Sequence, residues 1–163
     1  MVHSEALRCL GQLARRNPQS FGHRYAWALV NRASQSIHAM DYDDAVESSR
    51  LAFKQCRRAD GFTDQVDHSL AATALFNLTV AQFGLHRWRL AREAALKSQA
   101  AFRKAPSIDS TRKELLPQLT EMLTQIRKAS SGGGPGQDGP AFLGVRPMIS
   151  TQDRRHVKIS LAP

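Results

Sequence analysis

Side chains that could perform catalysis or bind a metal are scattered along this chain rather than grouped. The six histidines stand singly, and no two have the i, i+4 spacing that places two imidazoles on one metal ion. Cys9 and Cys56 lie among helical residues without CxxC spacing, which predicts buried, reduced thiols. The glycine-rich run at 132–136 lacks the Lys-Ser/Thr pair of a phosphate-binding loop. We therefore expect no enzyme, no metal and no cofactor.

The charged side chains of this sequence predict a positive surface that could bind anionic partners. The formal net charge is +9, because 23 Lys and Arg residues outnumber 14 Asp and Glu. The electrostatic field of this positive charge attracts nucleic acid, acidic proteins or anionic lipid, and the net charge alone does not indicate which of them is the partner. Most cations lie near predicted helix ends, where they also offset the helix dipole. If nucleic acid is the partner, the residues expected to bind it are Arg87, Arg89, Arg92, Arg103 and Lys104.

The chain repeats itself after 46 residues, since residues 28–59 align with residues 74–105. Ala45 and Ala91 hold the same place in the two copies, where antiparallel helices would approach most closely. A unit of this length accommodates a pair of helices. Its repetition is typical of an α-solenoid, whose surface usually binds partners.

Apolar and small residues recur every three to four positions, which predicts the individual helices. Two helix pairs are expected, over 21–39 and from the acidic turn at 41–44 to Gly61, then over 64–85 and 88–102. A lone helix over 5–17 precedes them, and another starts near Pro117, a residue suited to a first helical turn. The prediction is an all-α solenoid of two full repeats flanked by half repeats over residues 1–129. The Gly/Pro-rich tail, residues 130–163, is predicted to be disordered.

The pattern of large and small residues in the second repeat is specific enough to suggest a family. It comprises Leu75, Leu78 and Thr79 in one helix and Trp88, Ala91 and Ala95 in its partner, with Pro18 closing the partial first unit. This pattern resembles the tetratricopeptide repeat, and the spacing resembles its longer-repeat branch, which includes kinesin light chain. Three residues depart from that pattern: Arg32 replaces an expected Leu, and Met40 and His86 replace an expected turn Gly.

The resemblance implies a scaffold or adaptor that binds a peptide or protein segment in a concave groove lined by the first helices. Asn31 and Asn77 match a ladder of amides that bonds the partner's backbone, and Gln125 holds the equivalent place in the last helix. Arg24 and Arg32 could hold a carboxylate of the partner. The other side chains of this groove face either form pockets for apolar side chains of the partner or pack between the repeats; they are Trp27, Val30, Ser34, Ile37, Thr73, Phe76, Val80 and Phe83.

Two further expectations concern the ends of the chain and its location. Leu7, Leu10 and Leu13 are expected to expose an apolar face, either because the protein self-associates there or because the chain is the truncated end of a longer array. No apolar run has the length of a membrane span, and the N-terminus lacks the pattern of a signal peptide. We therefore expect a soluble cytoplasmic protein that does not bind membranes.

Overall fold

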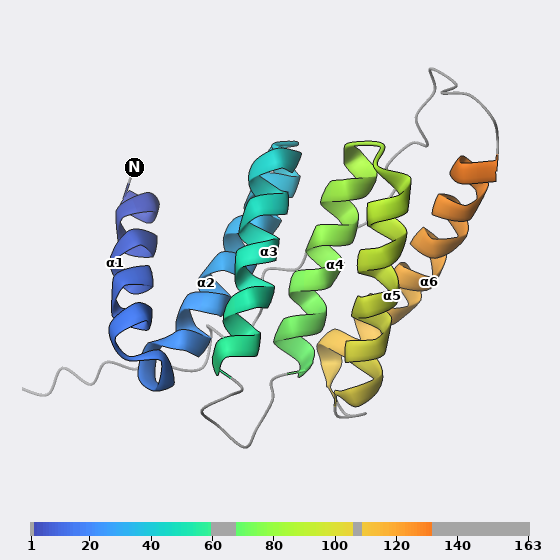
Figure 1. Ribbon diagram of the computed structural model, residues 1–163. Helices are drawn as coiled ribbons and strands as arrows, with labels where there is room; N and C mark the ends of the chain where they lie inside the picture. Colours follow the sequence, from blue (N-terminus) through green and yellow to red (C-terminus); the bar gives the residue numbers. More distant parts are fainter. Residues whose placement is uncertain (1, 60–67, 106–108, 132–163) are drawn as a thin grey trace, which may run out of the picture.

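The computed structural model describes residues 2–59, 68–105 and 109–131, and these residues are almost entirely helical (Figure 1). They contain no strand, which confirms the predicted all-α class. None of the described helices combines the length and the apolarity that crossing a membrane requires. Of the predicted tail, only Ser130 and Ser131 are described, and they continue the last helix. The helices are α1 (Val2–Arg16), α2 (Pro18–His38), α3 (Tyr42–Ala59), α4 (His68–Gly84), α5 (Trp88–Lys104) and α6 (Ser110–Ser131).

The helices pack in chain order, and each runs antiparallel to the one before it (Figure 1). In addition to its neighbours α3 and α5, α4 contacts α2 and α6, whereas α1 contacts only α2 among the described helices. Residues 69–85 include no charged side chain, which allows α4 to be buried on every side. The central helix is therefore α4, and every other described helix except α1 packs against it.

Both helix pairs turn in the same way, at positions 46 residues apart. In each turn a backbone N–H donates to the carbonyl five residues earlier, at 2.8 Å from Asp41 to Ser36 and at 2.9 Å from Arg87 to Gln82. This bond is typical of the Schellman motif, in which the residue after the helix is left-handed. Met40 and His86 occupy that position, with φ values of 58° and 56°. The structure thus places both residues where the resemblance leads us to expect glycine.

Met40 provides a test of the strain at this turn, because its side chain is 74% exposed and makes no contribution to the core. A left-handed conformation costs a residue with a side chain about 1–2 kcal/mol, and glycine avoids this cost. Glycine also loses more conformational entropy on folding, so only part of that free energy is gained. We expect Met40→Gly to raise the free energy of unfolding by about 0.5–1 kcal/mol in urea titrations. The control is Ala39→Gly, where φ is −80° and the change should destabilise. Equal changes in the free energy of unfolding for Met40→Gly and Ala39→Gly would contradict the left-handed conformation of Met40.

The last helix differs from the prediction, because α6 begins at Ser110 and Pro117 lies inside it. The side chain of Asp109 accepts a hydrogen bond from the backbone N–H of Thr111 at 2.8 Å, which caps the helix at its true start. Leu115 is fully buried, so packing holds the first turns in place. Pro117 is exposed and is the eighth residue of α6, past the first turn, so the carbonyl of Lys113 lacks the backbone donor that an uninterrupted helix would give it.

Candidate functional site

The predicted groove is mostly closed, because its residues form the contacts between α2, α4 and α6. Trp27 and Asn31 of α2 are half-buried. Most of this face packs between the helices rather than forming open pockets, since α4 lies between α2 and α6 and its side chains fill the space between them. The absence of charge over residues 69–85 was the sequence signal for this burial. The other predicted groove residues are all buried: Val30, Ser34, Ile37, Thr73, Phe76, Asn77, Val80 and Phe83.

The two ladder asparagines have different surroundings. The side-chain amide of Asn77 donates to the backbone carbonyl of Val30 at 3.1 Å and so joins α4 to α2. Its side chain is 1% exposed and lies within the helix contact. Asn31 is half-buried and lies at the edge of that contact. The Oδ1 atoms of both asparagines are buried and accept no hydrogen bond from the described residues. Gln125 is half-buried in α6 and donates to the carboxylate of Glu121 at 3.2 Å.

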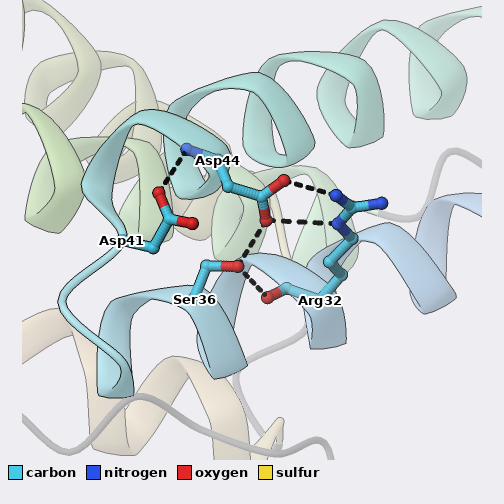
Figure 2. Close-up of polar contacts among 4 residues, drawn as sticks. All are labelled: Arg32, Ser36, Asp41 and Asp44. Atoms are coloured by element: carbon cyan, nitrogen blue, oxygen red, sulfur yellow. Dashed lines mark hydrogen bonds and ion pairs between the residues drawn. The ribbon is translucent and has the colours of Figure 1, made fainter. Parts of the chain in front are cut away.

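Arg32 does bind a carboxylate, but the carboxylate belongs to this chain (Figure 2). Its guanidinium donates to both carboxylate oxygens of Asp44 in α3, with a distance of 3.1 Å from Nε to Oδ2. The hydroxyl of Ser36 also donates to Asp44, and Asp41 accepts from the backbone N–H of Asp44 at 3.2 Å. The turn brings residues 32 and 44 together, so the guanidinium of Arg32 is engaged within the chain. Arg24 is exposed.

The cluster of Arg32, Ser36, Asp41 and Asp44 changes the pKa values of Asp44 and Arg32. The hydrogen bonds from Arg32 lower the pKa of Asp44. Burial opposes this with a smaller effect, and the hydrogen bond from Ser36 lowers the pKa further. The same bond to Asp44 raises the pKa of Arg32, which stays charged. The Asp44 side chain is 22% exposed, so solvent screens the pair only in part. The cluster thus fastens the start of α3 to α2.

Removal of the Arg32 side chain should reveal this link through its pH dependence. We expect Arg32→Ala to lower the free energy of unfolding by about 1 kcal/mol at neutral pH. Because folding lowers the pKa of Asp44, this stabilisation is present above the unfolded pKa of about 3.9 and disappears as pH falls through the folded pKa. Urea titrations should therefore show the two proteins converging in strongly acidic solution. Arg50→Ala, at an exposed arginine of α3, is the control. A difference between the wild type and Arg32→Ala that does not change with pH would contradict this account.

The five predicted polyanion-binding residues are all exposed, but they do not form one cluster. Arg87, Arg89 and Arg92 lie at the start of α5 and Arg103 and Lys104 lie at its end, with Arg92 and Arg103 about 16 Å apart along the helix axis. Arg87 forms an ion pair with Asp43 of α3 at 3.6 Å. The structure thus gives α5 a positive charge at both ends.

At the other end of the fold, α1 has an open side. Leu13 is 42% exposed, while Leu7 and Leu10 are half-buried, so part of the predicted apolar face is accessible. Cys56 is buried as expected, but Cys9 is exposed, since α1 has one neighbour among the described helices. Within the described ranges, His, Cys, Asp and Glu side chains form no group suited to a metal ion. Comparison of the sequence with known protein families, with curated proteins and with solved structures gives no match.

Proposed function

We propose that this protein is a tetratricopeptide-like adaptor, an α-solenoid of two helix-pair repeats flanked by half repeats, that binds a segment of another protein. Support comes from the two turns with the same hydrogen bonds 46 residues apart and from helices that pack in chain order. The fully buried Ala45 and Ala91 add to it, because they occupy equivalent positions in the two pairs. Repeats of this kind present long surfaces for protein partners.

One observation carries the proposed binding site, namely the amide of Asn31. Its Oδ1 atom, like that of the buried Asn77, accepts no hydrogen bond from the described residues, and a buried acceptor without a donor costs free energy. Asn31 differs from Asn77 because it is half-buried and lies at the edge of the helix contact. A backbone N–H of an extended partner would supply that donor once the Asn31 side chain turns outward, because Oδ1 is itself buried. Trp27 lies one turn earlier on the same side of α2 and is half-buried, so it offers apolar surface beside the amide. The proposed site is therefore the edge of α2 at Trp27 and Asn31, smaller than the groove predicted from sequence.

The test is affinity capture from nuclease-treated lysate, quantified by mass spectrometry, with the wild type compared with Asn31→Ala. We expect a set of proteins to be lost from the variant, because alanine removes the amide and leaves the helix intact. Gln35→Ala is the matched control, since residue 35 lies one turn further along α2, is exposed, and also carries an amide. Identical recovery by all three proteins would reject the site.

The second candidate is nucleic-acid binding through Arg87, Arg89, Arg92, Arg103 and Lys104, which the exposure of all five residues favours. Two observations reduce its support. Arg87 is already paired with Asp43, and an exposed leucine, Leu96, lies between the two groups of cations. Phosphate contacts would weaken steeply as the salt concentration rises, whereas binding with an apolar component would weaken less.

A further inference from the structure

The outer face of α5 carries an ordered row of exposed side chains. The opposite face packs on α4 and α6 through Ala91, Ala94, Ala95, Ser98 and Phe102. The row on the outer face, called here the α5 stripe, repeats at three and four residues, so its members lie one above the other on the helix. It consists of Arg89, Arg92, Leu96, Ala100 and Arg103.

The centre of the α5 stripe is apolar and its two ends are positive. Leu96 is 43% exposed, one of the few large apolar side chains of the described residues with this exposure. The only acid of α5, Glu93, accepts a hydrogen bond from Lys97 at 2.6 Å, so its charge is neutralised beside the stripe. Glu93 also interacts electrostatically with Arg89, one turn earlier, so Arg92 and Arg103 are the end arginines with the least opposing charge on their own helix.

The corresponding face of α3 lacks this arrangement, although it also has an exposed leucine. Leu51 is 38% exposed, and Arg50, Lys54 and Arg57 lie near it. The first turn of α3 is acidic, however, with Asp43 and Asp44 where α5 has cations. Acids in the first turn thus separate α3 from α5, whose first turn carries arginines, and this difference makes α3 the natural internal control.

We propose that the α5 stripe binds an acidic protein segment in which an apolar side chain is flanked on both sides by carboxylates. The carboxylates would pair with Arg89 and Arg92 at one end and with Arg103 at the other, about 16 Å from Arg92. The apolar side chain would cover Leu96 and Ala100, and its burial supplies affinity that salt does not screen. A nucleic-acid backbone carries charge at every residue and offers nothing apolar to cover Leu96, so a protein partner fits the stripe better.

This surface lies on a different helix from Trp27 and Asn31, so it goes beyond the proposed function and does not depend on it. The probe is a fluorescein-labelled synthetic peptide of 16 residues with leucines at its centre and glutamates at both ends. Two comparison probes are a peptide with serines in place of those leucines and a single-stranded DNA of 16 nucleotides. Binding to the full chain is measured by fluorescence anisotropy at low and physiological salt, and circular dichroism verifies that each variant folds.

We expect Leu96→Ser to weaken binding of the leucine peptide about fivefold and Arg92→Glu with Arg103→Glu to weaken it about tenfold or more. The matched controls on α3, Leu51→Ser and Arg50→Glu with Lys54→Glu, should change it less than about twofold. The serine peptide should bind more weakly than the leucine peptide and should not respond to Leu96→Ser. Equal effects of the α3 and α5 variants, no binding of the leucine peptide, or tighter binding of the DNA without sensitivity to residue 96 would each overturn the proposal.

Discussion

Replacing Phe76 with alanine should lower the free energy of unfolding by about 3–5 kcal/mol, the largest effect we expect for a single substitution. Phe76 has no exposed surface and lies on α4 in the core that also contains Phe102, Leu115 and Leu119. Removal of a ring from such a site loses its transfer free energy and leaves a cavity that helices packed from several sides cannot fill. Urea unfolding followed by circular dichroism measures this loss.

The same experiment decides between two roles of Phe76. A groove residue open to solvent could be truncated with little change in stability, and only partner binding would suffer. The control is Leu96→Ala on α5, because Leu96 is 43% exposed and its truncation should change the free energy of unfolding by less than about 0.5 kcal/mol. If Phe76→Ala lowered the free energy of unfolding as little as this control does, the face of α4 would be open to solvent. That result would support the groove predicted from the sequence.

Enlarging Ala91 to leucine should cost about 1–3 kcal/mol of stability, the second largest effect. Ala91 is fully buried on the side of α5 that faces the core, where a small side chain allows the helices to approach closely. A leucine there must displace neighbouring side chains or push the helices apart. The equivalent change at Ala45 in the first repeat should have a similar cost, because that residue is also fully buried.

Ala100→Leu tests whether the cost at Ala91 comes from packing rather than from the leucine itself. Ala100 lies on the same helix but is exposed, and leucine has nearly the helix propensity of alanine. We expect this control to change the free energy of unfolding by less than about 0.5 kcal/mol. Similar losses at positions 91 and 100 would show that Ala91 is not at a close helix contact.

Local signals in the sequence were sufficient for the two helix pairs and for the turn within each pair. The helix pairs follow from apolar periodicity, and the left-handed turn residues Met40 and His86 stand where a turn glycine was expected. The start of α6 was missed, because Pro117 drew the prediction away from the cap at Asp109. Capping and periodicity depend on residues a few positions apart, and this is why such features can be predicted from sequence.

The candidate site depended on contacts between distant residues. Periodicity identifies one apolar face of a helix, but α4 has four neighbours and buries its other faces as well. Eight predicted groove residues therefore belong to the helix contacts, and Trp27 and Asn31 remain at the edge. The adaptor function remains a proposal that the Asn31 variant tests.

The sequence by itself determined the helical class, the 46-residue repeat and the positive charge, because these are properties of residue order and composition. The tertiary structure alone decided which of those residues are accessible. It closed the face of α4, joined Arg32 to Asp44, and left Leu96 exposed between arginines at both ends of α5. Burial and ion pairing depend on which helices meet in space, and residue spacing along one helix does not contain that information.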